Sequence, residues 1–447
     1  MQWNQQLLKP IRLTPRFVFA SACGVLGIAS CVSLSSPRGS SGNIPVASGN
    51  YRNGRNQLVR IALETGATEE KIGATGAWAI YESGESSPIA QLKSSDSIAV
   101  SAPQDCNGGG QPCVRRVRLN PNINLPASAG AIVARPVGDG SYLTWNGKRY
   151  HGELLVSVGD SGALVVNRVP MDSYLMGVVP LEIGNRTTAE MAAVEAQAVA
   201  ARTYAYKHLT PSRAFDMYAT VQDQVYGGVD AEKPLADSAV NSTADVVVLY
   251  NGQPISTPYH STCGGSTAGV TEVWYDQPDE PYLRPVSDRI PGTNNYYCDP
   301  SPRFSWTQTY DADELRSVME KYLAAYTNAP KTKLGRITAI SEQGRTASGR
   351  VAALTVRTES GAYTLRGNDI RFVLRDPKGT ILNSTLFSLD AATSGGEVSR
   401  LTLTGRGYGH GIGMCQWGAI GRARAGQDYR TILATYYPGT TLGRIAG

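Results

Sequence analysis

The stretch GRGYGHGIGMCQWGA, residues 405–419, most restricts how this chain can fold. Its glycines surround His410, Cys415, Gln416 and one tryptophan. Glycine adopts positive φ angles and lets the backbone pass close to a ligand, but it loses more conformational entropy on folding than any other residue. So many glycines around reactive side chains predict a shaped loop that contacts a ligand.

Length and charge limit the classes of protein to consider. The chain has 447 residues and a net charge of +5, with an ordinary apolar content. It is long enough for two or three domains and can bury a sizeable core. Three basic residues and no acidic ones lie within positions 1–30, so the remainder carries about +2. This near-neutral value argues against a nucleic-acid-binding protein and leaves a polar glycan or peptide as the substrate.

The N-terminus has the pattern of an export signal. Basic residues precede the apolar stretch 17–28, which is too short to span a membrane comfortably. The following run, Ile-Ala-Ser-Cys, resembles a lipobox, in which cleavage precedes the cysteine and Cys31 receives lipid. Cleavage elsewhere and an uncleaved anchor are the alternatives. We expect a signal peptide and lipobox over 1–31, a flexible Ser/Gly/Pro linker over 32–57, and a lipoprotein anchored in the cell envelope.

The cysteine count fits an exported protein. Of the seven cysteines, Cys23 would be removed with the signal and Cys31 would carry lipid. Disulfides suit an oxidising compartment, although sequence alone does not prove their pairing. The candidate disulfides are Cys106 with Cys113 and Cys263 with Cys298, which leaves Cys415 as a lone thiol.

The secondary-structure pattern changes along the chain. Residues 58–166 are β-rich, and Asn146-Gly147 predicts a tight hairpin. Asp172 is a candidate N-cap for a short helix that Pro180 and Gly184 would limit.

The second half alternates helices and strands. Thr187 with Glu190 forms a capping-box pattern that opens a long alanine-rich helix ending near Pro211. Strands and loops are expected over 221–267, a helix over 311–326 and three strands after it. We therefore expect an α+β fold, in which a β-rich region at 58–153 precedes a domain of mixed helix and antiparallel sheet at 154–447.

Glu182 is the first candidate for chemistry. It follows an apolar run at the end of a predicted helix, where the helix dipole is negative. The apolar surroundings and the negative end of the helix dipole both raise a carboxyl pKa, which suits a general acid at neutral pH. The alternative is an ordinary solvated glutamate at a helix end.

Four other residues suggest different chemistry. His410 and Cys415 would make a thiol peptidase or amidase if their side chains converged, but a buried, unreactive Cys415 is the simpler interpretation. His260 and Cys263 supply half of a metal site, and a structural zinc needs four ligands.

Five sequence blocks occurring in order resemble the SpoIID/LytB family of cell-wall proteins over roughly 154–442. They are VVNRVPMDSYLMGVVPLEI, EAQAVAARTYAYKH, QVYGG, TPYHSTCGGST and GHGIGMCQWGA. The resemblance implies peptidoglycan as substrate. Sporulation members resemble lytic transglycosylases that cut peptide-stripped glycan strands, and others are described as enhancers of a cell-wall amidase.

The resemblance also assigns roles to residues. The family's catalytic carboxylate corresponds to Glu182, although Ile183 replaces the usual methionine. Some members hold zinc through His and Cys near the HST block. Here no second His/Cys pair lies nearby in the sequence, so we expect no metal and no other cofactor. The expected glycan-binding residues are Tyr226, His260, Ser261, His410 and Gln416; Tyr226 and Trp417 are candidates both for stacking on sugars and for the core.

Glu182 would protonate the glycosidic oxygen and then take the proton of the sugar's own C6 hydroxyl, giving a 1,6-anhydro product. The leading hypothesis is thus a lytic transglycosylase acting on peptidoglycan strands, with a cell-wall amidase as a further expected partner and no nucleic acid. The alternative is a non-catalytic glycan-binding or amidase-enhancing protein.

Overall fold

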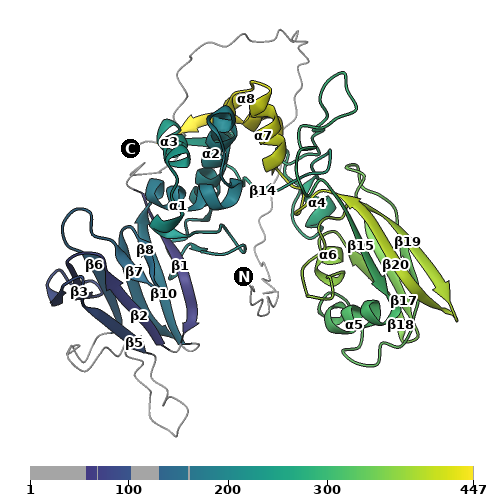
Figure 1. Cartoon of the computed structure of the whole chain (residues 1–447), viewed down its shortest axis with the longest axis horizontal. Coiled ribbons are helices and arrows are strands. Elements are labelled where there is room, and N and C mark those ends of the chain that lie inside the picture. Colours follow the sequence, from purple (N-terminus) through teal and green to yellow (C-terminus); the bar gives the residue numbers. More distant parts are fainter. Residues whose placement is uncertain (1–56, 68, 102–129, 160–161, 446–447) are drawn as a thin grey trace, which may run out of the picture. The chain divides into compact units, whose positions relative to one another are not determined.

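The computed structural model describes residues 57–67, 69–101, 130–159 and 162–445 (Figure 1). The predicted signal, Cys31, all but the last residue of the linker, and the pair Cys106 and Cys113 lie outside the described residues. Within the described residues, no helix combines the length and apolar character that crossing a membrane requires.

Antiparallel strands dominate the N-terminal region, as predicted. A seven-stranded sheet has the order β11-β1-β10-β9-β6-β3-β4, and a four-stranded sheet has the order β5-β2-β7-β8. The strands of these two sheets are β1 (Leu58–Ala67), β2 (Glu69–Ala74), β3 (Trp78–Glu82), β4 (Pro88–Leu92), β5 (Ser97–Ser101), β6 (Ala131–Pro136), β7 (Leu143–Trp145), β8 (Lys148–Tyr150), β9 (Glu153–Gly159), β10 (Gly162–Pro170) and β11 (Met217–Tyr218).

Two details of these sheets bear on the predictions. The hairpin between β7 and β8 turns at Asn146 and Gly147, which both have positive φ, at 48° and 76°. The seven-stranded sheet also crosses the boundary expected between 153 and 154. Strand β1 pairs with β10 from Leu58↔Pro170 onward, and β6 pairs with β9.

Helix α1 (Met171–Ile183) follows β10 directly and carries the candidate catalytic glutamate near its end. Pro170, rather than the predicted Asp172, occupies the N-cap position. Asp172 lies in the first turn, where its carboxylate accepts a hydrogen bond from Arg202 at 3.4 Å. Pro180 lies inside the helix and does not end it. Gly184 ends the helix with a φ of 77°, as predicted.

Helix α2 (Met191–His208) is the predicted alanine-rich helix. The Thr187–Glu190 capping box is present and opens a short 3-10 turn, η2 (Thr188–Glu190), that leads into α2. Arg202 of α2 is buried and donates to the carbonyl oxygens of Val240 and Thr243 at 3.0 and 2.8 Å. The alanines let α1, α3 and β12 approach α2 closely.

Two distant stretches of the sequence, 228–273 and 414–444, supply further elements. The prediction of only strands and loops over 221–267 was wrong, because α3 and the 3-10 turn η3 lie there. These elements are η3 (Gly228–Ala231), α3 (Pro234–Ser242), β12 (Val246–Tyr250), β13 (Gln253–Pro254), β14 (Tyr259–His260), α4 (Val270–Val273), β21 (Met414–Cys415), α7 (Gln416–Arg424), α8 (Tyr429–Tyr436) and β22 (Thr441–Arg444).

Residues 305–406 build a second hydrophobic cluster, whose buried members all lie between 310 and 403. Two three-stranded antiparallel sheets have the orders β15-β20-β19 and β16-β17-β18, and α5 packs against β15 and β20 (Figure 1). The elements are β15 (Ser305–Asp311), α5 (Ala312–Tyr322), η4 (Leu323–Ala325), β16 (Ile337–Glu342), β17 (Ala353–Thr358), β18 (Gly361–Arg366), α6 (Asp369–Val373), β19 (Phe387–Ser394) and β20 (Glu397–Arg406).

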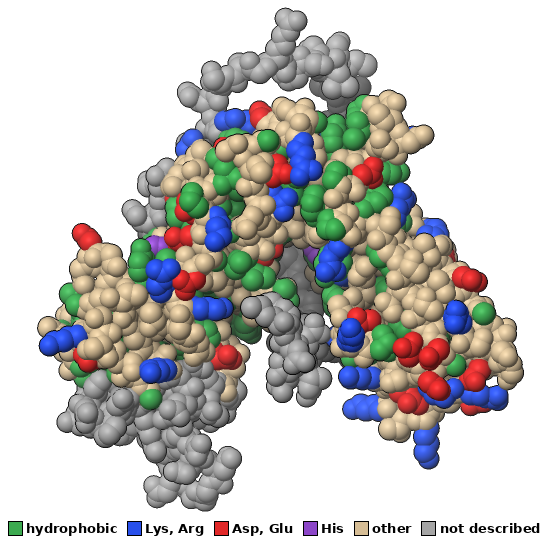
Figure 2. Space-filling model, viewed as in Figure 1, with side chains coloured by type: hydrophobic (Ala, Val, Ile, Leu, Met, Phe, Trp, Pro, Cys, Tyr) green, Lys and Arg blue, Asp and Glu red, His purple; other side chains and the backbone are tan. Residues whose placement is uncertain are grey.

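The first hydrophobic cluster joins the N-terminal strands to α1, α2, α3, α7 and α8. On the face drawn in Figure 2, basic and acidic side chains are interspersed over the surface. The α+β fold class and the β-rich N-terminal region are therefore as expected, and the second cluster is an organisation that the sequence did not reveal.

Candidate active site

Glu182 lies near the C-terminal end of α1, half-buried. Its Oε1 accepts a hydrogen bond of 2.8 Å from the backbone N–H of Val225. Burial raises the pKa of Glu182 to about 7, and the Val225 hydrogen bond offsets only part of that rise. The carboxyl group is thus poised to be both protonated and ionised near neutral pH, which is what a general acid requires.

Among the described residues, the polar surroundings of Glu182 include no cation that pairs with it. Burial is the main cause that raises the pKa of Tyr174, Tyr204 and Tyr259, and the charge of Glu182 adds to each rise, so their phenol groups lie within its electrostatic reach. The Tyr174 hydroxyl donates to Oε1 of Gln224 at 3.0 Å, and the amide of Gln224 donates to the Tyr259 hydroxyl at 2.8 Å. Within the described ranges Glu182 forms no ion pair, so desolvation sets its pKa.

The QVYGG block presents Val225 to Glu182 by packing closely on α1. The amide of Gly227 donates to the Gly177 carbonyl at 3.1 Å. A Cβ atom at Gly177 would lie 2.6 Å from Cε2 of Tyr226, so only glycine admits the tyrosine ring there. This contact fixes the backbone from which Val225 donates.

The same packing bears on the prediction for Tyr226. Its side chain is only 5% exposed, and its hydroxyl donates to Oδ1 of Asn167 at 2.8 Å. Its ring also packs against those of Tyr150 and Tyr174. Tyr226 is a core residue, which is one of the two roles that the sequence left open for it.

The TPYHST block and the glycine-rich stretch meet as two short parallel strands. Tyr259 pairs with Met414 and His260 with Cys415 in the β14–β21 ladder. Gly413 has a φ of 69°, and a Cβ atom there would lie 2.0 Å from the carbonyl oxygen of Pro258. The glycine-rich stretch is therefore only partly a loop, since α7 begins at Gln416.

His410 is bonded on both ring nitrogens. Its Nε2 lies 2.8 Å from the carbonyl oxygen of Tyr259, and its Nδ1 accepts from the N–H of Ile412 at 3.1 Å. Burial, together with Arg371, lowers the pKa of His410 to about 3, so the ring is neutral. Both ring nitrogens are therefore engaged with backbone atoms, and the ring holds Tyr259; the hydrogen bond from His410 to a sugar stays a prediction.

His260 is almost completely buried beside His410, with ring centroids 5.4 Å apart. Its Nδ1 lies 3.1 Å from the carbonyl oxygen of Ile412, and within the described ranges its buried Nε2 has no partner. Burial lowers the pKa of this imidazole well below its usual value. Its burial argues against the predicted contact with a glycan.

Gln416 and Ser261 differ in exposure. Gln416 is buried and donates to Oε1 of Gln197 in α2 at 3.2 Å. Its burial argues against the predicted contact with a glycan. Ser261 is half-buried, and its carbonyl accepts the N–H of Trp417 at 3.0 Å. The guanidinium of Arg186 lies over the half-buried ring of Trp417, at 5.3 Å from the ring centroid. Arg186 follows Glu182 closely in sequence, but no motif pointed to it.

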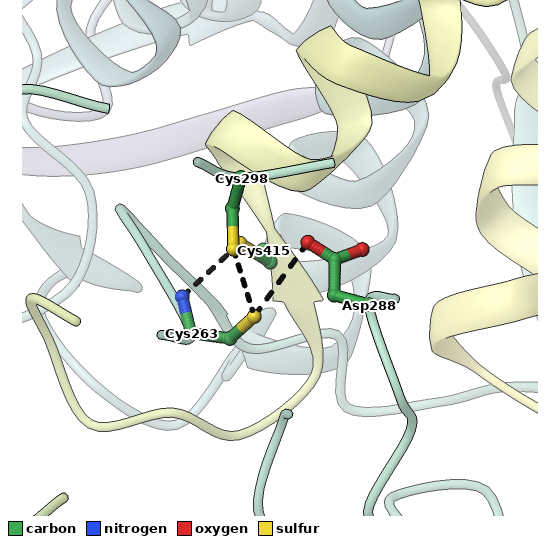
Figure 3. Close-up of side chains that lie close together, drawn as sticks. All are labelled: Cys263, Asp288, Cys298 and Cys415. Carbon is green, nitrogen blue, oxygen red and sulfur yellow. Dashed lines mark hydrogen bonds between the residues drawn. The ribbon is translucent and has the colours of Figure 1, made fainter. Parts of the chain in front are cut away.

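Cys415 is buried with two other cysteines and Asp288 (Figure 3). Burial raises the pKa of its thiol well above the usual range, and His410 bonds backbone atoms instead, so the pair forms no nucleophile and base. The predicted disulfide between Cys263 and Cys298 is absent from the described structure. Both are free thiols with sulfurs 3.5 Å apart, well beyond a bond of about 2.05 Å.

Comparisons with known proteins identify the family. Residues 159–250, which include Glu182 and Val225, match the family model described as Stage II sporulation protein. An uncharacterized protein of Brachyspira hyodysenteriae is 32% identical over 67% of this chain and 73% of its own length. This chain belongs to the SpoIID/LytB family. Membership of the family indicates a cell-wall-related function.

Two further relatives of the family are from Bacillus subtilis. The protein named Amidase enhancer is 32% identical over 60% of this chain but only 40% of its own length. Stage II sporulation protein D is 28% identical over 62% of this chain and 75% of its own length. A second family model, Domain of unknown function (DUF8618), matches residues 290–413 and so covers most of the second hydrophobic cluster.

Proposed function

We propose that this chain is an exported lytic transglycosylase that cleaves peptidoglycan glycan strands, with Glu182 as the single acid and base. The observation that carries the proposal is the burial of Glu182 at the end of α1, which raises its pKa to about 7 and meets no opposing cation among the residues that the structure describes. A general acid acts best when its pKa lies near the working pH. Family membership supplies the cell wall as the setting.

This one carboxyl group can both donate and accept the protons that the reaction requires. Protonated Glu182 donates to the glycosidic oxygen as its bond to C1 of N-acetylmuramic acid breaks. Positive charge develops at C1, as in other glycoside cleavages. The new carboxylate then accepts the proton of the C6 hydroxyl while O6 bonds to C1. The product is a 1,6-anhydro end, no water is consumed, and Glu182 is protonated again.

The neighbouring carboxylate, Asp223, favours this mechanism over hydrolysis. Hydrolytic glycosidases use two carboxyl groups. In Asp223, Oδ1 accepts from the Tyr204 hydroxyl at 2.9 Å and Oδ2 from the N–H of Tyr218 at 2.8 Å. Because both oxygens are engaged, Asp223 does not supply a second catalytic carboxylate.

The half-buried groups near the end of α1 are the proposed glycan contacts. The Arg186 guanidinium lies over the aromatic ring of Trp417. Ser261 lies beside Trp417, because its carbonyl accepts a hydrogen bond from the Trp417 backbone N–H. His410 acts as a positioning residue, since it binds the carbonyl of Tyr259, whose hydroxyl joins Gln224. These residues replace Tyr226, His260 and Gln416 of the sequence prediction.

The test uses the purified full chain with intact and with peptide-stripped peptidoglycan, followed by mass spectrometry of the products. We expect 1,6-anhydro ends from the wild type that are lost in Glu182→Gln. A matched control is Glu320→Gln, an exposed glutamate of α5, which should keep full activity. Reducing-end products without anhydro ends would instead indicate hydrolysis and overturn the mechanism.

A second candidate function follows from the relative named Amidase enhancer. On this alternative the same surface binds glycan without cleaving it and delivers a cell-wall amidase to its substrate. The two functions separate when an amidase is added to the assay. No glycan product from the chain alone, with faster peptide release when both proteins are present, would favour the alternative.

We also propose that the chain reaches the cell envelope as a lipoprotein modified at Cys31, since its N-terminal sequence has the pattern of a lipobox. Mass analysis of the mature N-terminal peptide tests this directly. We expect a diacylglycerol-modified cysteine at position 31, absent in Cys31→Ser. An unmodified N-terminus at another residue would contradict it.

A further inference from the structure

A cluster of three thiols and one carboxylate lies outside the Glu182 site and takes no part in the proposed reaction. Cys263 follows β14, Asp288 and Cys298 belong to the irregular segment after α4, and Cys415 ends β21. All four residues are fully buried. In Figure 3 the sulfurs and the carboxylate turn toward one another from these separate segments.

The distances between the four groups suit a small tetrahedral ion. Sγ of Cys263 lies 3.5 Å from Sγ of Cys298 and 3.7 Å from Oδ2 of Asp288. All four ligand atoms lie within 4.8 Å of one another. With zinc–sulfur bonds of about 2.3 Å, neighbouring ligands of a tetrahedral zinc are separated by about 3.8 Å. The cluster therefore needs only small adjustments to close around such an ion.

The backbone supports sulfur ligands rather than a packed apolar contact. The N–H of Cys263 donates to Sγ of Cys415 at 3.1 Å, and the N–H of Gly418 donates to the same sulfur at 3.3 Å. The N–H of Gly265 donates to Sγ of Cys263 at 3.4 Å. Backbone N–H groups directed at ligand atoms are outer contacts of the kind that orient the ligands of a metal centre.

Outer groups orient the carboxylate. Oδ1 of Asp288 accepts from the Tyr436 hydroxyl at 2.7 Å and pairs with Arg422 at 3.2 Å. The other oxygen, Oδ2, is left facing the thiols. Partners that fix one oxygen of a ligand and leave the other for the ion are typical of metal centres. Gly418 allows this approach, because a Cβ atom there would lie 2.6 Å from Oδ2.

Charge compensation and redox chemistry also favour a metal ion bound by the four groups. Three thiolates and one carboxylate around a divalent cation leave a net charge of −2, and buried charge needs compensation. Arg422 binds Asp288, Arg350 donates to the carbonyl of Cys263 at 3.1 Å, and α7 begins directly after Cys415. In addition, three sulfurs cannot all be satisfied by disulfides in an oxidising compartment, whereas one ion engages every one of them.

We propose that Cys263, Asp288, Cys298 and Cys415 form a closed structural zinc site. Soft thiolate ligands in a tetrahedral set favour zinc, and full burial leaves no open position for a reacting water. Neither histidine of the motif blocks belongs to the cluster, so this ligand set differs from the His/Cys set that the family resemblance suggested. The expectation of no metal rested on sequence proximity, whereas the ligands come from three separate segments.

The site would hold β21 and the start of α7 against the segment that carries Asp288 and Cys298. Trp417, two residues after Cys415, projects from that start of α7. The zinc would therefore fix one proposed glycan contact without touching the substrate. The proposal does not depend on the chemistry of Glu182, because metal content is measured without any activity assay.

The experiment measures metal in the purified full chain by inductively coupled plasma mass spectrometry and then replaces zinc by cobalt. We expect about one zinc per chain, and a cobalt spectrum with intense thiolate charge-transfer bands and tetrahedral d–d bands. Cys298→Ser and Cys415→Ser should each lower zinc occupancy at least tenfold at limiting metal. Cys106→Ser, which leaves all four proposed ligands in place, should retain full occupancy.

Three results decide the matter even where a variant folds poorly. Non-reducing peptide mapping of the wild type that finds a Cys263–Cys298 disulfide would overturn the proposal. So would free thiols that bind no zinc when the reduced protein is titrated with the metal. Zinc bound at full occupancy in both cysteine variants would place the ion elsewhere and would also overturn it.

Discussion

The backbone N–H of Val225 lies 2.8 Å from Oε1 of Glu182, so the QVYGG segment orients the carboxyl group at the end of α1. This single donor stabilises the carboxylate, but burial outweighs it and the pKa rises to about 7. The relationship joins two motif blocks whose connection the sequence does not show. It gives Glu182 an acid form and a base form of similar free energy.

The first prediction concerns the pH dependence of activity. The reaction begins with protonated Glu182, so kcat/KM should be level below pH 7 and fall about tenfold per unit well above it. His410 is neutral because its pKa is about 3, so it adds no transition between pH 5 and 7. The measurement is kcat/KM on peptide-stripped glycan from pH 4.5 to 9. A rate that rises through pH 7 would contradict a protonated starting form.

The second prediction concerns stability in Glu182→Gln. Folding raises the pKa of this carboxyl from 4.5 to about 7, so the folded state binds the proton more tightly than the unfolded state. Ionisation therefore destabilises the fold progressively from pH 4.5 to 7, and the cost is complete above pH 7. Glutamine retains an acceptor for Val225 and removes the charge.

Urea unfolding at several pH values checks this linkage. At pH 8 we expect the variant to be more stable than wild type by about 1–2 kcal/mol, because water partly screens the half-buried carboxylate. Below pH 4.5 the difference should vanish. The contrary result is a difference in unfolding free energy, variant minus wild type, that is more negative at pH 8 than at pH 4.5. It would show that ionised Glu182 gains a favourable charge interaction on folding.

The third prediction separates core from glycan contact at Tyr226. Tyr226→Phe removes the hydroxyl that donates to Asn167, which leaves a buried acceptor with one partner fewer. We expect a loss of about 1–2 kcal/mol in unfolding free energy and an unchanged KM for glycan. An increased KM at unchanged stability would return Tyr226 to the binding surface.

The fourth prediction tests Trp417 as a glycan contact. Its half-buried ring lies under Arg186, close in sequence to the end of α1. Trp417→Ala should raise KM about five- to tenfold while kcat changes less than twofold, because the lost contact is made equally in ground and transition states. Thermal unfolding of the variant serves as the control. A fall in kcat alone would assign the ring to positioning instead.

Local signals in the sequence predicted the local structure well. The Asn146-Gly147 turn, the capping box at Thr187 and Glu190, and the Gly184 helix end follow from short-range backbone chemistry. The place of Glu182 at a helix end after an apolar run suggested a raised pKa, and the family resemblance then made it the catalytic candidate. Its pKa depends on burial by side chains from other segments, and the sequence could suggest only the direction of that shift.

Long-range placement could not be predicted. Tyr226 occurs in a loop, where no periodicity indicates burial, and the glycine that admits its ring lies in α1. Cys263 and Cys415 are 152 residues apart, so spacing rules for metal sites do not connect them. Nor did the glycine-rich stretch reveal that His410 uses both ring nitrogens on backbone atoms.

The most direct test of the central claim is mass spectrometry of the products that wild type and Glu182→Gln release from peptide-stripped peptidoglycan. We expect 1,6-anhydro-muramic ends from the wild type and a loss of at least a hundredfold in the variant, the scale of general acid–base catalysis. Equal yields of anhydro ends from both proteins would contradict the assignment of Glu182 as the acid and base.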